Sequence, residues 1–141
     1  MNRFSLDASA LLTLFVPDIH TKKLNAWLVS DPRWLIVSDF ASAEASASIS
    51  RRVRMGLLDT GLANEALAKL DGWVSRTTTR RLTSAGDIAA CERLVRRFEL
   101  KLQAPDALHI AIALGDGATL VTFDERQAQA MATLGPCVGP G

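Results

Sequence analysis

The chain has 141 residues, of which 48% are hydrophobic and 22% charged, and its formal net charge is +1. This composition is typical of one soluble globular domain over residues 1–141, and the charge balance excludes a general attraction to nucleic acid. Two cysteines without motif spacing exclude a disulfide scaffold, and no signal peptide or membrane span is evident, so we expect a cytoplasmic protein.

The first half of the chain predicts two strands and four helices. The apolar run “FSLDA” (residues 4–8) predicts a strand, followed by helices over residues 9–17 and 21–31. The continuous apolar segment “WLIVSDF” (34–40) is typical of a strand that is buried on both faces. Helices are then expected at about 41–55 and 63–74, with Gly56 between them.

The second half continues the alternation. The β-branched segment “TTTRRLT” (77–83) predicts a strand, and Ser84 with Asp87 resembles a capping signal for a helix that continues to about Phe98. A helix beginning at Pro105, the strand “ATLVTF” (118–123), a helix after Asp124 and a last short strand, “CVGPG” (137–141), complete the chain. The Gly and Pro in this tail suggest a truncated strand or one at the sheet edge.

Strands that alternate with helices predict a parallel sheet covered on both faces, with ligands beyond the carboxyl ends of the strands. Asp7, Asp39 and Asp124 end predicted strands and should point to that edge. Asp106 opens the apolar helix “APDALHIAIA”, and Glu44 lies among small residues in “ASAEASAS”. Each acid alone also has a structural explanation, because Asp caps helices, acids suit the first helical turn, and Glu44 suits a solvated face.

Several carboxylates brought together without nearby lysines would repel one another, so a hard divalent cation among them is the better explanation. Mg²⁺ and Mn²⁺ prefer oxygen ligands, and the chemistry most served by such a site is phosphodiester hydrolysis. We expect Asp39 and Asp116 to lie outside the site, as strand-end and turn residues. His109 is interpreted as a hydrogen-bonded core histidine without a catalytic role.

The motifs “LDASALL”, “SAEASAS”, “PDALHIAIA” and “LVTFDER” occur in this order along nearly the whole chain. Their order resembles the PIN-domain ribonucleases, and most closely the VapC-type toxins of VapBC toxin–antitoxin pairs. The resemblance implies an α/β fold, a three-layer α/β/α sandwich around a central parallel sheet of four or five strands. It also implies an endoribonuclease toxin that depends on Mg²⁺ or Mn²⁺, forms a homodimer and is inhibited by a cognate antitoxin.

The resemblance assigns roles to individual positions. The implied catalytic and metal-binding set is Asp7, Glu44, Asp106 and Asp124. Ser9 and Thr122 match positions that support such a site by hydrogen bonding.

Three arginines in “RRVR” are weaker candidates for contacts to RNA phosphates: Arg51, Arg52 and Arg54. Cations at a helix C-terminus are equally expected on structural grounds. The apolar helices near Leu11 to Phe15 and Trp27 are candidates for a partner or dimer surface, with core packing as the alternative.

Other proteins also gather acids at strand ends. A dehalogenase-type phosphatase needs a second Asp two residues after the first, and Ser9 stands there; a receiver domain needs adjacent acids before its strand-end Asp, and none precede Asp7. The remaining alternative is a non-catalytic PIN-like module that binds RNA or protein. Loss of acids would be its signature, and all four matching acids are present.

Overall fold

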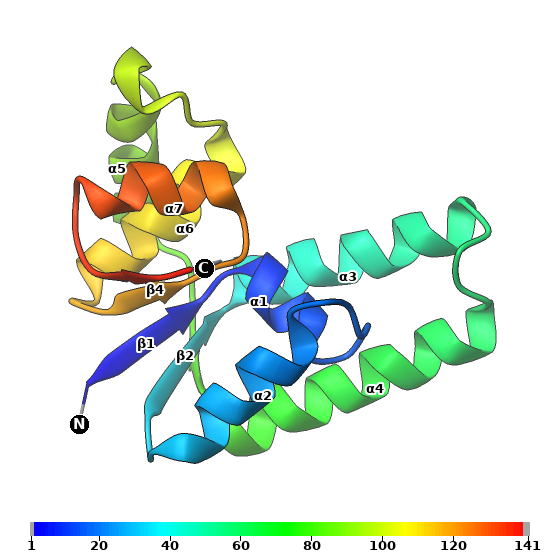
Figure 1. Ribbon diagram of the computed structural model, residues 1–141. Helices are drawn as coiled ribbons and strands as arrows, with labels where there is room; N and C mark the ends of the chain where they lie inside the picture. Colours follow the sequence, from blue (N-terminus) through cyan, green and yellow to red (C-terminus); the bar gives the residue numbers. More distant parts are fainter. Residues whose placement is uncertain (1, 140–141) are drawn as a thin grey trace.

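The computed structural model describes residues 2–139 and has a five-stranded parallel sheet between two layers of helices (Figure 1). The strands are β1 (Arg3–Leu6), β2 (Trp34–Ser38), β3 (Thr79–Arg81), β4 (Thr119–Val121) and β5 (Cys137–Val138), in the spatial order β3-β2-β1-β4-β5. The three-layer α/β/α sandwich is therefore confirmed, with five strands and the short last strand at the edge.

The register of the central strands aligns their ends. Leu6 of β1 lies opposite Val37 of β2 on one side and Val121 of β4 on the other. The residues that follow these three positions therefore come out together at the carboxyl edge of the sheet, where parallel sheets bind ligands.

One face of the sheet is covered by the helices of the first half of the chain (Figure 1). These helices are α1 (Ala8–Thr13), α2 (Thr21–Ser30), α3 (Asp39–Arg54) and α4 (Thr60–Thr77). Leu11 and Leu24 from the helices pack with Leu6, Val37 and Val121 from the strands. Beyond the sheet α3 and α4 continue as an arm, and Gly56 (φ +73°) turns the chain between them.

The other face carries α5 (Ala85–Val95), a 3₁₀ turn (Phe98–Leu100), α6 (Ala104–Gly115) and α7 (Glu125–Ala132) (Figure 1). Leu120 packs here against Ile110, Ile112 and Met131. Leu120 and Val121 thus face opposite layers, as the two-residue period of a strand requires. Within residues 2–139, no helix combines the length and hydropathy needed to cross a bilayer.

Side-chain caps explain where most helices begin. A side-chain oxygen at the residue before the helix accepts a backbone N–H at the starts of α1, α3, α4, α5 and α7; the caps are Asp7, Ser38, Asp59, Ser84 and Asp124. The predicted signal at Ser84 and Asp87 is a full capping box, in which each side chain bonds the other residue's backbone. Pro105 lies in the first turn of α6, where its missing N–H has no cost.

Several predicted boundaries were wrong. The first helix ends at Thr13 rather than near Pro17, because the Thr13 hydroxyl bonds Asp18 and turns the chain toward α2. The helix predicted over 63–74 begins at Thr60, because Asp59 caps it. The helix after Ser84 ends at Val95, and Phe98 belongs to the separate 3₁₀ turn.

All five strands are shorter than predicted; those predicted over 4–8, 34–40 and 77–83 span Arg3–Leu6, Trp34–Ser38 and Thr79–Arg81. The strand predicted over 118–123 is limited to Thr119–Val121, since the next two residues bond to α1 and its cap: the Thr122 hydroxyl donates to Asp7 and the Phe123 N–H to Ser9. Of the strand predicted over 137–141, Cys137 and Val138 are paired with β4, and residues 140 and 141 lie outside the described residues.

Arg81 ties the sheet edge to the second helical layer. Its guanidinium binds Asp87 of α5 in a bidentate pair, with one Nη2–Oδ1 distance of 2.9 Å, and its Nε donates to Asp116 at the end of α6 (3.1 Å). The Asp87 side chain is 8% exposed, and the Arg81 hydrogen bonds lower its pKa from 3.8 to about 2.

We expect Asp87→Asn to lower the free energy of unfolding at pH 7 by about 2 kcal/mol, the equivalent of the pKa difference between 3.8 and about 2. Because the folded pKa lies below the unfolded one, this stabilisation is present above pH 4 and is lost as the pH falls through about 2. Urea denaturation at pH 7 and pH 3 should show the difference shrinking. Glu92→Gln is the control, because its pair with Arg96 is more than half exposed and should contribute less than ~0.5 kcal/mol.

Candidate functional site

Asp7 is buried where β1 ends and α1 begins. Its Oδ1 accepts hydrogen bonds from Ser9 Oγ (2.7 Å) and the Ala10 N–H (2.9 Å), and its Oδ2 accepts one from Thr122 Oγ1 (2.5 Å). The residue is 2% exposed, and burial raises its pKa against the opposing effects of His109 and these hydrogen bonds. The predicted supporting residues, Ser9 and Thr122, thus both contact the Asp7 carboxylate.

A second set of bonds joins Asp7 to the loop after β4. Thr122 Oγ1 accepts the Asp124 N–H (3.0 Å) and lies 3.1 Å from Gln127 Oε1. Asp124 caps α7 by accepting the Gln127 N–H (3.0 Å), and Gln127 Nε2 donates to the Asp106 carbonyl (3.1 Å). The start of α6, the start of α7 and the end of β1 are therefore one hydrogen-bonded unit.

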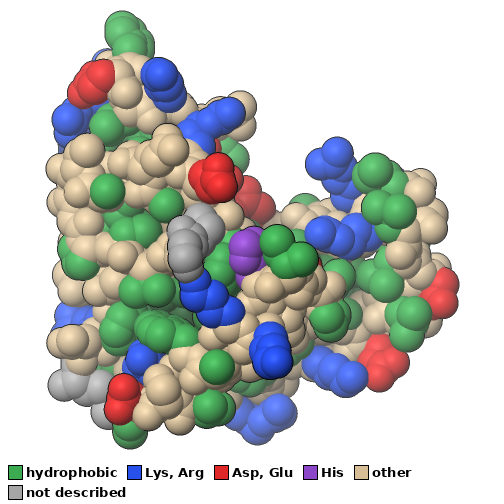
Figure 2. Space-filling view, in the orientation of Figure 1, with side chains coloured by type: hydrophobic (Ala, Val, Ile, Leu, Met, Phe, Trp, Pro, Cys, Tyr) green, Lys and Arg blue, Asp and Glu red, His purple; other side chains and the backbone are tan. Residues whose placement is uncertain are grey.

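Asp106 and Asp124 line a common polar groove, which has a volume of about 650 Å³. Asp124 is exposed and Asp106 is half-buried. Gln103, Lys101 and Arg126 also line this groove, so cations lie beside the acids at its mouth. Figure 2 shows this face hollowed between the second helical layer and the α3–α4 arm, with acidic side chains (red) on the wall of the hollow.

Glu44 reaches the site from α3. Its Oε1 lies 2.6 Å from Nε2 of His109, which is 5% exposed on α6 and packs against Phe40. The Glu44 side chain remains 31% exposed. His109 is thus a hydrogen-bonded core histidine, as expected, and it holds Glu44 toward the other acids.

The carboxylates influence one another electrostatically. Burial raises the pKa of Asp106, and the negative charges of Asp124 and Glu44 raise it further, while a backbone bond at Gln103 and the charge of Arg126 act in the opposite direction. A proton or a cation between these groups would relieve this repulsion.

The donor set is chemically suited to a hard divalent cation, because its ligands would all be carboxylate oxygens. Within residues 2–139, the structure has no group of three or more His, Cys, Asp or Glu side chains that is arranged to hold a metal ion. Asp7 lies in the interior, Glu44 against His109, and Asp106 and Asp124 along the groove. The four-residue metal site therefore stays a prediction, supported by the groove that Asp106 and Asp124 share.

Two acids outside the candidate site have different partners. Asp39 accepts hydrogen bonds from the backbone (3.0 Å) and hydroxyl (2.5 Å) of Thr83, and Asp116 binds Arg81. Both lie in the positions expected for strand-end and turn residues outside the site.

The three arginines suggested for RNA contact lie at the far end of α3. Arg51 and Arg52 line a separate pocket with Met55, while Arg54 donates to Ser50 one turn earlier on the same helix. They do not line the groove of Asp106 and Asp124. Their proposed contact with RNA stays a prediction.

Sequence reasoning missed Gln127, Lys101 and Arg126. Gln127 is 1% exposed and occupies the buried stripe of α7 together with Ala130 and Met131. A glutamine at helical spacing from two apolar residues was the available signal. Lys101 gives no such signal, because its place in the groove comes from a left-handed turn (φ +56°).

Most of the chain matches a known domain family. The sequence profile of the PIN domain matches residues 5–132, which include every element from the end of β1 to α7. The chain belongs to the PIN domain family. A comparison with curated protein sequences finds no significant match.

Solved structures share the fold of this PIN domain. A VapBC2 complex from Rickettsia felis bound to promoter DNA has a TM-score of 0.72 at 18% identity, covering 99% of each chain. VapC20 of Mycobacterium tuberculosis, a sarcin–ricin loop cleaving toxin, has a TM-score of 0.67 at 21% identity, covering 90% of this chain and 94% of that one. A toxin–antitoxin complex from Klebsiella pneumoniae has a TM-score of 0.68 at 19% identity, covering 98% and 96%. At these identities the likeness establishes the fold.

We expect Asp106→Asn to raise the melting temperature of the metal-free PIN domain at neutral pH. The raised folded pKa means that the ionised carboxyl destabilises the fold as the pH rises past the unfolded value of 3.8, and the asparagine removes this penalty. The gain should vanish below that pH, where the acid is protonated in both states. Added Mg²⁺ or Mn²⁺ should stabilise the wild type more than the variant.

Asp31→Asn is the matched control, since the Asp31 side chain is 77% exposed at the end of α2 and should change neither measurement. If Asp106 serves only the helix start, its loss should instead cost a few tenths to about 1 kcal/mol. An Asp106→Asn protein that melts lower in chelator and gains as much from metal as the wild type would contradict the site.

Proposed function

We propose that this PIN domain is a Mg²⁺- or Mn²⁺-dependent endoribonuclease of the VapC toxin type. The observation that carries the proposal is the placement of the acids: Asp106 and Asp124 line one groove at the carboxyl edge of the sheet, and His109 holds Glu44 toward them. Membership of the PIN family supports nuclease activity in general, and the VapC structures share the fold over nearly the whole chain.

The residues that would hold the ion are Asp7, Glu44, Asp106 and Asp124. When bound, such an ion supplies positive charge at the scissile phosphate and lowers the pKa of a coordinated water. Ser9 and Thr122 fix the Asp7 carboxylate, and His109 fixes that of Glu44. Asp124 is the most accessible of the four, so it is the acid that an incoming phosphate meets first.

The groove beside the acids supplies cations for the RNA backbone. Lys101 and Arg126 line it together with Asp106 and Asp124, whereas Arg51 and Arg52 line a different pocket. Lysine and arginine position nucleic acid through phosphate contacts without reading sequence. We therefore propose Lys101 and Arg126 as the principal phosphate contacts, with Arg51, Arg52 and Arg54 as contacts further along the strand.

We expect purified protein to cut total RNA in Mg²⁺ or Mn²⁺ and not in chelator, with the fragment ends mapped by sequencing. Asp7→Asn and Asp106→Asn should each reduce cleavage at least ~100-fold, the size of effect typical for losing charge stabilisation at a reacting phosphate. Asp31→Asn should cut normally.

The same assay compares the two sets of cations. Lys101→Ala with Arg126→Ala should weaken RNA binding and reduce its dependence on salt, by more than Arg51→Ala with Arg52→Ala. Binding of RNA without cleavage by metal-replete wild type would instead favour the non-catalytic module.

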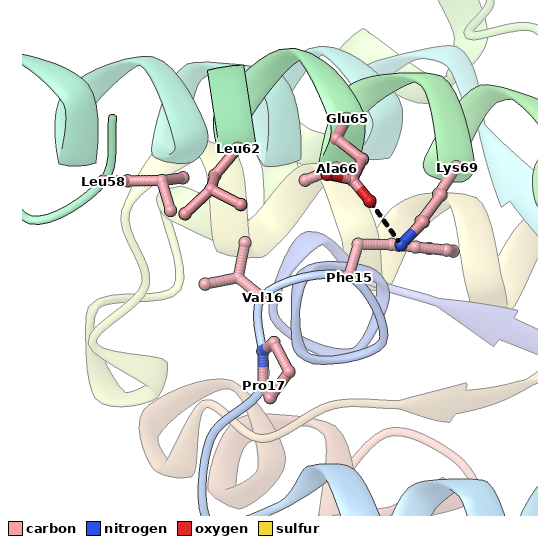
Figure 3. Close-up of a pocket in the computed structure, with 8 residues that line it drawn as sticks. All are labelled: Phe15, Val16, Pro17, Leu58, Leu62, Glu65, Ala66 and Lys69. Atoms are coloured by element: carbon pink, nitrogen blue, oxygen red, sulfur yellow. Dashed lines mark ion pairs between the residues drawn. The ribbon is translucent and has the colours of Figure 1, made fainter. Parts of the chain in front are cut away.

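An apolar groove lies between the chain after α1 and the first turns of α4 (Figure 3). Val16 and Pro17 lie opposite Leu58 and Leu62, and Phe15 lies beside Lys69, around a volume of about 240 Å³. The ion pair of Glu65 and Lys69 (3.0 Å) borders the groove. Leu62 is 54% exposed. We propose this groove as the docking site for an apolar segment of the cognate antitoxin.

The earlier candidates for a partner surface are partly revised by packing. Leu11 is fully buried, and Trp27 packs against Phe4 and the Arg33 guanidinium, so both serve the core. Phe15 is the member of that set that lines the groove. We also propose a homodimer and a cytoplasmic location, where the RNA substrate is found.

We expect expression of the protein alone to arrest bacterial growth and co-expression of the neighbouring gene to restore it. Asp7→Asn should be harmless. Leu62→Glu should arrest growth but resist rescue, because a charge placed in the groove opposes an apolar segment. Light scattering of purified protein should give the mass of two chains; harmless expression of soluble, metal-replete wild type would contradict the toxin assignment.

A further inference from the structure

His20 and Phe123 form an aromatic stack at the carboxyl edge of the sheet. Their ring centroids are 4.4 Å apart and the ring planes differ by 12°. Phe123 directly precedes Asp124, and its N–H donates to Ser9 Oγ (2.9 Å), which in turn donates to Asp7 Oδ1 (2.7 Å). Two hydrogen bonds therefore connect the stack to the buried carboxylate of the candidate site.

The start of α2 does not need a histidine. His20 occupies the N-cap position, where Ser, Thr, Asp or Asn is preferred, and its side chain makes no capping bond. Asp18 and Thr21 organise this turn instead: Asp18 Oδ1 accepts the His20 N–H (2.8 Å), and the Asp18 N–H donates to Thr21 Oγ1 (2.8 Å). These bonds fix the backbone of the turn, and the imidazole takes no part in them.

Docking of α2 on the sheet does not need the stack either. Leu24 is 3% exposed and packs in the core cluster that contains Val121, and Trp27 packs edge-on against Phe4 at 5.0 Å. Phe123 is partly buried against the same cluster, and His20 is partly exposed above it. Phe123 therefore covers one face of an imidazole ring that is itself partly exposed.

We infer that the His20–Phe123 stack is a platform for a nucleobase of single-stranded RNA next to the scissile phosphate. Unpaired bases stack on aromatic and imidazole rings, and this contact tolerates any base because each has a π-face. The groove of Lys101 and Arg126 receives phosphates, while the stack, beside Asp124 in the chain, receives a base. The inference rests on the proposed RNA cleavage and assigns His20 as a positioning residue of that reaction.

The test compares two RNA decamers of equal charge in chelator, where nothing is cut. One decamer is oligo(A) with a central 2-aminopurine, the other has abasic spacers throughout, and both carry the same 5′ fluorescein. Fluorescence anisotropy gives the Kd for wild type, His20→Leu and His20→Phe. Leucine has no π-face, whereas phenylalanine provides an aromatic ring without the imidazole nitrogens.

His20→Leu should weaken oligo(A) binding roughly tenfold, within the range measured for losing one base–aromatic stack, and His20→Phe should keep it. The abasic decamer should bind all three proteins equally. Emission of 2-aminopurine should be quenched by the wild type and His20→Phe, and in Mn²⁺ His20→Leu should raise KM more than it lowers kcat. Quenching of 2-aminopurine by the wild type tests base stacking even if His20→Leu does not fold.

Two results would overturn the platform alone: a wild type that cuts RNA without quenching 2-aminopurine, or a His20→Leu protein that loses equal affinity for both decamers. A wild type that neither binds nor cuts RNA would overturn the proposed function, and the platform with it.

Discussion

The buried carboxylate of Asp7 is the constraint on which the site depends. A carboxyl group in the protein interior is tolerated only if hydrogen-bond donors surround it. Ser9, Ala10 and Thr122 supply these donors, so the end of β1, the first turn of α1 and the residue after β4 must be in register. The same hydroxyl of Thr122 accepts the Asp124 N–H, so the buried carboxyl group of Asp7 also helps to fix an exposed acid.

Glu44 is held by a separate contact, with His109. His109 comes from α6 in one helical layer and Glu44 from α3 in the other, so their contact crosses the carboxyl edge of the sheet. Because the imidazole is buried and packed on Phe40, it limits where the flexible glutamate side chain can point. Two layers with separate hydrophobic clusters are therefore connected at the edge where the acids gather.

The architecture could be predicted from the sequence because its signals are local. The apolar run of β2, the capping box of Ser84 and Asp87, and Pro105 at the start of α6 each act within a few residues. Acids at strand ends could then be placed by topology alone. The end of α1 could not be predicted from the sequence. The contact of Thr13 with Asp18 turns the chain there, and it depends on a loop that has no hydrophobic periodicity.

The sequence predicted which acids belong to the candidate site better than it predicted the residues around them. Spacing gave no hint that Lys101 would reach the groove, because a left-handed residue between the 3₁₀ turn and α6 sets its direction. Gln127 lies in α7, a helix with several polar residues, so its burial was not recognised from the sequence. Long-range contacts such as that of Glu44 with His109 require the packed tertiary structure, and a single sequence does not encode them in any short pattern.

The two edges of the sheet limit how this protein can associate with other chains. β3 has three residues, two of them arginines, and β5 has two residues. An edge this short, or this charged, gives an approaching strand few backbone groups to pair with. Sheet extension between molecules is therefore disfavoured, and stable contacts with a second chain have to be made by helices and their side chains.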